Sequence, residues 1–173
     1  MIYGVHFHGV VLMPNHFHIL ATIPMHDLGK VMNVFISDIT RITNKATHRS
    51  GHLFQGPYHW TLINSSRYFG HALKYVYRNP VKAGLCERAE DYPFSTLYGL
   101  MGSAHLPFPI YFTESFMEKT LPWNNAESML NWLNTPFPSD AEKIIQRGLR
   151  TRTFQQSVNR TNRRKNLLLE ELL

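Results

Sequence analysis

The chain has 173 residues, a formal net charge of +6, and 43% apolar residues, which is enough for one domain with a core or for one domain plus a tail. Its single cysteine cannot form an internal disulfide, so we expect a cytoplasmic protein. No apolar run of about 18 residues and no signal-peptide pattern is present, so we expect neither a membrane span nor a secreted product.

A hairpin is predicted at the start of the chain. Residues 2–12 are rich in β-branched and aromatic side chains, which favours a strand. The run Met13-Pro14-Asn15 then predicts a turn. Residues 16–23 are predicted to form the second strand.

A helix is predicted after this hairpin, beginning near Asp27, which could cap it, and ending before Ser50-Gly51. Its apolar residues recur at steps of three and four, and we expect this stripe to lie in the core. The residues of the stripe are Leu28, Met32, Phe35, Ile39 and Ile42.

The rest of the chain alternates ordered and irregular segments. A third strand is predicted over residues 58–63, and a helix over 67–78 that Pro80 should end. Residues 90–120 are rich in Pro, Gly and aromatics, and we expect them to be irregular. Short helices are predicted over 125–134 and from Ser139-Asp140 through Gly148.

Four side chains point to a catalytic site. Alternate strand residues share a face, so His16 and His18 present two imidazoles to one side, where they could bind one divalent metal. Tyr75 and Asn79 are neighbours on a helix, four residues apart. If that helix packs over the hairpin, a metal held by two imidazoles and an amide oxygen would polarise a phosphate, and the tyrosine could attack it.

Each of these assignments has a competitor. His6 and His8 repeat the His-x-His spacing, and a partly buried or DNA-facing histidine is the simpler interpretation of both. Tyr77 lies about 200° around the helix from Tyr75, so the two cannot face the same metal. Asn79 before a proline is also an ordinary helix end.

Several runs resemble one family. VLMPNHFHIL resembles the His-hydrophobic-His motif of the HUH endonucleases, and YVYRNPVKAGL resembles the tyrosine helix of the REP-associated tyrosine transposases. LFQGPYHWTLI and EDYPFSTLYG also resemble that family, so the likeness extends from about residue 9 to 99. In the family the Met-Pro-Asn turn precedes the metal-binding pair, which favours His16 and His18 over His6 and His8.

The resemblance implies an α+β fold with a ferredoxin-like antiparallel sheet and helices packed on one face. It implies a Mg²⁺ or Mn²⁺ cofactor held by His16, His18 and Asn79, with Tyr75 as the nucleophile. The substrate would be single-stranded or hairpin DNA, nicked and joined through a 5′-phosphotyrosine. The family normally carries a first strand and helix before this segment, so we expect the chain to be N-terminally short and marginal unless that place is filled.

We divide the chain into a catalytic core at 1–100, an irregular extension with small helices at 101–142, and a basic tail at 143–173. Between Lys143 and Lys165 there are eight basic residues and no acidic one, which fits either a DNA-binding arm or a solvated tail. The candidate DNA contacts are Lys74, Arg78, Lys82, Arg150, Arg152, Arg163, Arg164 and Lys165.

The expected protein is a cytoplasmic, bacterial transposase that associates with the nucleoid when bound to DNA, as a monomer or homodimer. Two alternatives stay open. The chain could be a DNA-binding module or truncated transposase remnant without catalysis, or a metal-dependent hydrolase of small phosphoesters. Only the transposase would form a covalent adduct with DNA.

Overall fold

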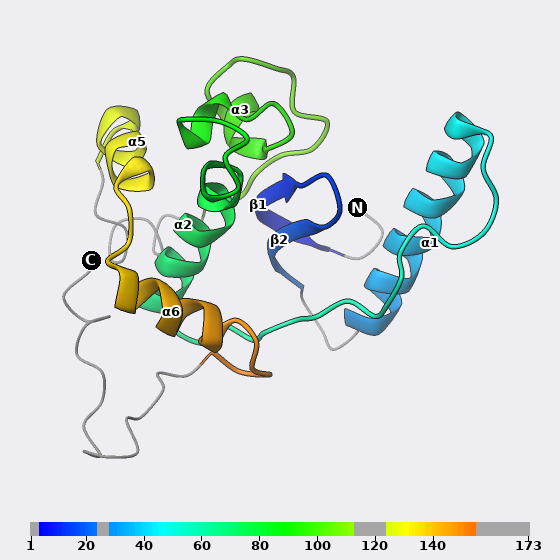
Figure 1. Ribbon diagram of the computed structural model, residues 1–173, viewed down its shortest axis with the longest axis horizontal. Helices are drawn as coiled ribbons and strands as arrows, with labels where there is room; N and C mark the ends of the chain where they lie inside the picture. The colour runs from blue at the N-terminus through cyan, green and yellow to red at the C-terminus, as the bar shows by residue number, and fades with distance from the viewer. Residues whose placement is uncertain (1–3, 24–27, 113–123, 155–173) are drawn as a thin grey trace. The chain divides into compact units, whose positions relative to one another are not determined.

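The computed structural model describes residues 4–23, 28–112 and 124–154 of the chain. The chain divides into two compact units, the first formed by residues 1–6 and 22–59 and the second by residues 7–21 and 60–173. The elements are shown in Figure 1. Helices long and apolar enough to cross a membrane are not found in the described part of the chain.

The first unit contains α1, which spans Leu28–Thr47. The helix ends as expected before Ser50, with the Asn44 side chain donating to the Gly51 carbonyl at 2.8 Å. The prediction that the apolar stripe of this helix lies in the core is wrong, because no residue of α1 is buried and Ile42 is 59% exposed. Among the described residues of this unit, α1 is the one helix, and no other helix is there to cover its apolar stripe. Asp27, the expected cap, lies outside the described residues.

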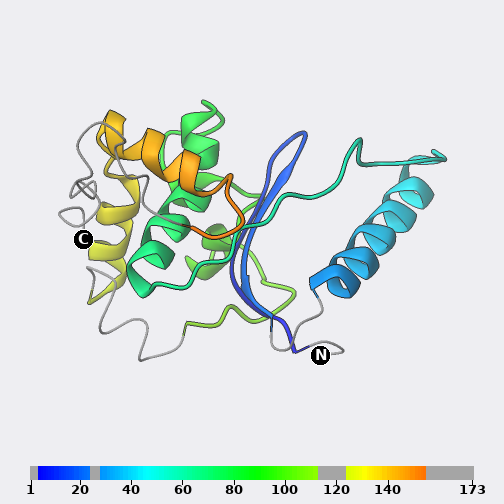
Figure 2. The ribbon, with the colours of Figure 1, turned by 90° about the horizontal axis from the view of Figure 1, so that it is seen from below.

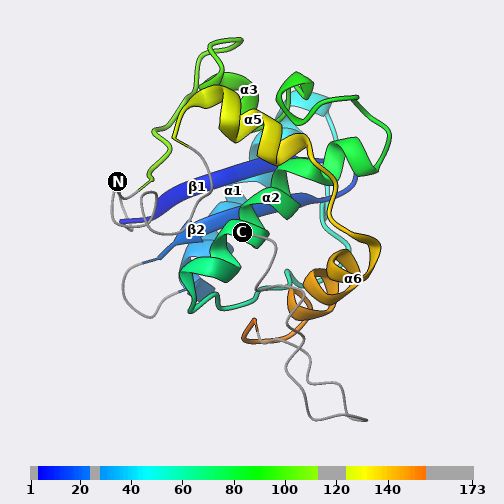
Figure 3. The same cartoon turned by 90° about the vertical axis from the view of Figure 1, so that its left-hand side faces the viewer.

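The second unit is built on an antiparallel pair of strands. β1 spans His6–Leu12 and β2 spans Phe17–Thr22, as the alternation of the sequence predicted. The turn between them is closed by the Met13 N–H, which donates to the His16 carbonyl at 2.8 Å. The helices of this unit, α2, α5 and α6, lie on the same side of the hairpin in Figures 2 and 3.

The helices of the second unit include three that the sequence predicted and two short ones, within residues 89–100, although residues 90–120 were expected to be irregular. They are α2 (Ser66–Lys82), η1 (Ala89–Asp91), α3 (Thr96–Leu100), α5 (Ala126–Asn134) and α6 (Ser139–Gly148). α5 begins with a capping box, in which the Asn125 side chain accepts the Ser128 N–H and the Ser128 hydroxyl accepts the Asn125 N–H. The described structure is therefore α+β, with a two-stranded antiparallel sheet packed against helices.

The hairpin packs closely on α2 because β1 carries a glycine at the contact. A Cβ built on Gly9 would lie 3.2 Å from the Leu73 and Tyr77 side chains, so with a larger residue here these side chains would have to shift slightly. Val11 and Leu20 of the hairpin share a core with the buried face of α2. The members of that face are Phe69, Ala72, Leu73, Val76 and Tyr77.

The other edge of β1 is occupied by segments that follow α2. The Leu12 N–H donates to the Phe94 carbonyl at 2.9 Å, and the Val10 N–H donates to Thr96 Oγ1 at 2.9 Å. Farther along, the Tyr111 N–H donates to the Phe7 carbonyl at 2.8 Å. Residues 94–111, which contain α3 and irregular chain, thus satisfy backbone groups that an edge strand would leave open.

Two details of the second unit differ from the expectations. Pro80 does not end α2, which continues to Lys82. Proline removes the N–H that would donate to the Val76 carbonyl, but the Asn79 side-chain nitrogen lies 3.5 Å from that oxygen and partly replaces the donor. The expected strand at 58–63 forms only an isolated parallel bridge, between Leu62 and Thr153.

The segment expected as a basic tail is ordered in its first part. Residues 143–148 complete α6, and Ile144, Ile145 and Phe154 are buried in a second hydrophobic cluster with Ala141. These apolar residues recur along one face of the helix, which anchors this part of the chain. Residues 155–173 lie outside the described part.

Candidate functional site

His16, the residue before β2, and His18, the second residue of β2, face each other. The Nε2 atoms of His16 and His18 lie 3.1 Å apart. Asn15 Oδ1 lies 2.6 Å from His16 Nδ1. If this oxygen accepts the Nδ1 proton, the lone pair of His16 Nε2 is left directed toward His18. Asn15, expected only as a turn residue, is therefore part of the site.

His18 is held in its neutral form. Burial, followed by repulsion from His16, lowers the pKa of His18 from 6.5 to about 4. A neutral imidazole is the form that binds a metal, so no proton has to be displaced near neutral pH.

Helix α2 brings the predicted tyrosine to this pair. The rings of His18 and Tyr75 lie edge to face, with centroids 6.0 Å apart. One turn later, the Asn79 side-chain nitrogen donates to the Tyr75 carbonyl at 2.8 Å. The nitrogen is thereby engaged within the helix, which leaves Asn79 Oδ1 as the acceptor that could serve a cation.

The donors fit a small divalent cation. Two neighbouring ligands at about 2.1 Å from one ion lie roughly 3 Å apart, close to the 3.1 Å between the histidine nitrogens. Among the described residues, no group of three or more His, Cys, Asp or Glu side chains could hold a metal ion. From the described part of the chain, Asn79, a neutral ligand, is the candidate to join His16 and His18.

Tyr77, unlike Tyr75, is enclosed in the core. Its side chain is 1% exposed, and its hydroxyl lies 3.0 Å from Thr96 Oγ1 and 3.3 Å from the His8 carbonyl oxygen. Burial raises the pKa of Tyr77 to about 12, although the hydrogen bond with Thr96 acts in the opposite direction. Tyr75 is half-buried and lines a pocket.

His8 has a structural environment. It is buried, its Nδ1 is hydrogen bonded with the Tyr111 carbonyl, and its ring meets the Phe69 ring edge-on at 5.1 Å. His6 is exposed. These placements match the simpler interpretation of the first His-x-His pair.

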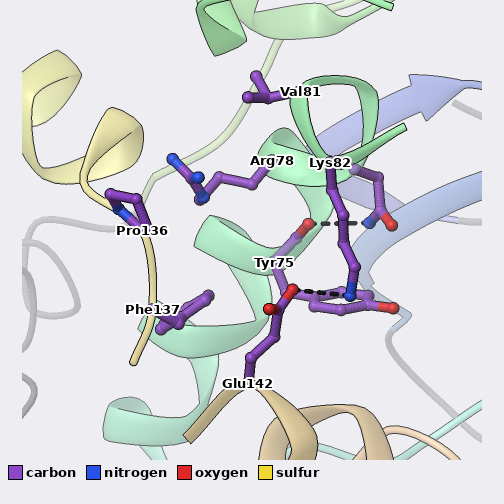
Figure 4. A pocket seen from close by; sticks show the side chains of 8 residues that line it. Tyr75, Arg78, Val81, Lys82, Pro136, Phe137 and Glu142 are labelled. Carbon is purple, nitrogen blue, oxygen red and sulfur yellow. Dashed lines mark hydrogen bonds and ion pairs between the residues drawn. The ribbon is translucent and has the colours of Figure 1, made fainter. Parts of the chain in front are cut away.

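A pocket of about 150 Å³ opens beside Tyr75, between α2 and the segment that leads into α6 (Figure 4). Lys82 and Glu142 reach toward each other across it, with Nζ and Oε1 2.7 Å apart. The lining residues are Tyr75, Arg78, Asn79, Val81, Lys82, Pro136, Phe137 and Glu142.

The basic residues predicted as DNA contacts have different environments. Lys74 is only 5% exposed, and its ammonium group lies 4.7 Å from the Trp132 ring centroid and 4.8 Å from that of Phe137. Burial, followed by repulsion from Arg78, lowers the pKa of Lys74 to about 8. Arg78 donates to the carbonyls of Leu133, at 3.0 Å, and Asn134, at the end of α5. Both therefore have partners within the second unit.

The remaining predicted contacts lie farther along the chain. Arg150 and Arg152 are exposed. Arg163, Arg164 and Lys165 lie outside the described residues. Lys82 borders the Tyr75 pocket, as Arg78 does, and its side chain is 45% exposed.

Comparison with known proteins identifies two relatives. The chain is 31% identical over 90 residues to a REP-associated tyrosine transposase of Escherichia coli (strain K12), covering 51% of this chain and 52% of the relative. It is 25% identical over 100 residues to a putative REP-associated tyrosine transposase of Haemophilus influenzae, covering 51% and 57%. No protein-family model and no solved structure matches. The alignments span about half the length of these curated relatives, and over that half the chain is similar to the REP-associated tyrosine transposases that its motifs resemble.

Proposed function

We propose that this chain nicks and joins single-stranded DNA at hairpin-containing sites, with Tyr75 as the nucleophile. The observation that carries the proposal is the edge-to-face contact of Tyr75 with His18, whose Nε2 in turn faces that of His16. The names of the two relatives support a transposase of this kind. The burial of Tyr77 leaves Tyr75 as the accessible tyrosine on this part of α2.

In the proposed reaction, the Tyr75 hydroxyl attacks the phosphorus of a DNA phosphodiester. The Tyr75 O–P bond forms as the P–O3′ bond breaks, the tyrosine proton passes to solvent, and the departing 3′-oxygen takes up a proton. The DNA 5′-phosphate stays on the tyrosine as a diester, so a second 3′-hydroxyl can reverse the step without ATP. A Mg²⁺ or Mn²⁺ ion held by His16, His18 and Asn79 would polarise a phosphate oxygen and stabilise negative charge.

The neighbouring side chains have supporting roles in this proposal. Asn15 is a positioning residue, because its oxygen fixes the ring and tautomer of His16 from the side opposite the metal. Lys82 is a cation in the pocket lining that could contact a phosphate, and to do so it would exchange Glu142 for DNA.

A labelled DNA hairpin with a single-stranded flank tests the proposal. The chain is incubated with it and Mg²⁺ or Mn²⁺, and the products are separated on a denaturing gel. We expect a labelled band at the mass of protein plus DNA that EDTA prevents. Binding without an adduct would indicate a DNA-binding module. Release of phosphate from a small phosphoester without an adduct would indicate a hydrolase, and either result would overturn the proposal.

A further inference from the structure

Two segments about 90 residues apart, residues 60–62 and 152–154, are joined in the second unit by the isolated parallel bridge between Leu62 and Thr153. We call this pair of segments the ladder. The Leu62 N–H donates to the Arg152 carbonyl at 2.9 Å, and the Phe154 N–H donates to the Leu62 carbonyl at 2.8 Å. Thr61 Oγ1 lies 2.8 Å from the Leu149 carbonyl oxygen and 2.7 Å from that of Thr151. The backbone on both sides is therefore held in place before any ligand arrives.

This ladder displays an aromatic ring and a cation. Trp60 is 40% exposed, and the Arg152 guanidinium lies 5.0 Å from its ring centroid. Leu62, two residues on, is 55% exposed. The Trp60 ring stacks with arginine and remains partly in water. It is therefore not a core residue, and its open part is available to a ligand.

The charge of both segments favours a polyanion. Residues 39–86 contain no Asp or Glu, and neither do residues 143–165. Arg147 and Arg150 are exposed near Arg152 in the sequence. The nearest acidic residues along α6 are Asp140 and Glu142 in its first turn, and Glu142 is paired with Lys82.

The ladder is connected to the tyrosine helix through one hydrophobic cluster. Phe154, the last residue of the ladder, packs on Tyr68 of α2 with ring centroids 4.7 Å apart. Tyr75 packs against the same cluster, which Phe154 forms with Ala141, Ile144 and Ile145. A DNA strand bound at Tyr75 would thus have the ladder as a neighbouring surface of the same unit.

We propose that Trp60 and Arg152 form a stacking platform for single-stranded DNA. An unpaired base stacks on the open part of the indole, while Arg152 holds the ring and offers N–H donors to an adjacent phosphate, which Arg150 also contacts. The platform would hold the single strand that flanks the phosphate cleaved by Tyr75. The role of the platform in holding the flanking strand rests on the proposed function. Its binding of single-stranded DNA does not depend on that function.

Binding to an unstructured oligothymidylate in EDTA tests the platform without involving metal, hairpin recognition or cleavage. We measure fluorescence anisotropy of the labelled oligonucleotide across a salt series. Trp60→Ala should weaken binding by about 5–100-fold, and Trp60→Phe should retain most of the affinity, since stacking on an aromatic ring contributes about 1–3 kcal/mol per base. Arg152→Gln should lower the slope of log affinity against log salt by about 0.7, as expected for one lost phosphate contact on a single strand.

Phe94→Ala is the matched control, because Phe94 is an exposed aromatic residue, at 63%, next to the acidic turn of η1. It should bind the oligonucleotide like the wild type, and circular dichroism melting should show that every variant is folded. Equal affinity of Trp60→Ala and wild type would overturn the platform, whether or not Tyr75 forms an adduct. Trp60-dependent binding without any adduct on hairpin DNA would retain the platform and reject the proposed function.

Discussion

His16 Nε2 and His18 Nε2 lie 3.1 Å apart, with Asn15 bonded to the far side of the His16 ring. Two nitrogen lone pairs at this separation repel each other unless a proton or a cation lies between them. Burial, and then repulsion between the His18 and His16 charges, lowers the pKa of His18 to about 4, so a proton is not expected to fill this place near neutral pH. The pair is therefore arranged to share a cation, and each ligand can be tested separately.

Replacing either histidine should remove metal binding. We expect His16→Ala and His18→Ala each to weaken Mn²⁺ binding by at least about 10–100-fold, the loss that even a residue outside the ligand set can cause. Electron paramagnetic resonance of free Mn²⁺ during a titration measures this without DNA. His6→Ala is the control with the same spacing, and an equal loss in that variant would mean that the wrong pair has been assigned.

Asn15 should affect the same titration through orientation. Asn15→Ala is expected to weaken Mn²⁺ binding by about 10–100-fold, because the His16 ring loses the partner that fixes it. Asn15→Asp keeps an acceptor at the same place and should restore most of the affinity. If Asn15→Ala binds Mn²⁺ as tightly as the wild type, Asn15 has no positioning role.

Tyr77→Phe should weaken the fold and leave the chemistry intact. The change removes a buried hydroxyl that lies within hydrogen-bond distance of Thr96 and the His8 carbonyl. We expect a loss of about 1–2 kcal/mol and a melting temperature lower by roughly 2–8 °C. Thermal melting measures the first effect and the DNA adduct assay the second. Loss of the adduct in folded Tyr77→Phe would contradict the assignment of roles.

The hairpin, the tyrosine helix and the two late helices follow from local patterns, because each buries one periodic face. The pairing of Leu62 with Thr153 does not follow from a local pattern, because it joins residues about 90 positions apart and β propensity depends on the partner strand. The continuation of α2 through Pro80 to Lys82 was not predicted, because a rule about proline leaves out neighbouring side chains such as Asn79, whose nitrogen lies 3.5 Å from the Val76 carbonyl oxygen.

The site shows the same division between local and long-range information. His16 and His18 could be paired from strand alternation, and Tyr75 from helical spacing. The burial of Lys74 between Trp132 and Phe137 could not be predicted, because both rings come from a segment more than 55 residues later in the chain. Sequence motifs predicted the candidate site, whereas which cations remain exposed depends on long-range packing.

Lys74 should make stability depend on alkaline pH. Its pKa is about 8 in the folded chain against an ordinary value of 10.5, so between these values the unfolded chain binds more protons. The free energy of unfolding should then rise as pH increases from 8 toward 10. Above this range the effect of Tyr77 is opposite, because its pKa of about 12 in the fold lets this tyrosine ionise more readily in the unfolded chain. Urea denaturation at pH 7.5 and 9.5 measures the change. Lys74→Met should lose this rise in stability, and Lys143→Met, a control at an exposed lysine, should keep it. An equal rise in the two variants would contradict Lys74 as its cause.

A shortened chain tests the basic end without disturbing the core. Because Ile144, Ile145 and Phe154 are buried, the cut belongs after Phe154 and not at Lys143. Residues 155–173 include four basic residues, Arg160, Arg163, Arg164 and Lys165. Their removal should weaken DNA binding and lower its salt slope by up to about 3, with the adduct retained at saturating DNA. Identical slopes for both chains would show that these residues do not contact phosphates.

The site of covalent attachment tests the central claim most directly. After reaction with a hairpin DNA and nuclease trimming, trypsin cleavage at Lys74 and Arg78 releases a peptide of residues 75–78, which contains both Tyr75 and Tyr77. Tandem mass spectrometry then assigns the nucleotide to one of them. The account predicts a nucleotide 5′-phosphate on Tyr75 and no linkage in Tyr75→Phe, which should still bind the hairpin. A nucleotide on Tyr77, or an undiminished adduct in Tyr75→Phe, would contradict it.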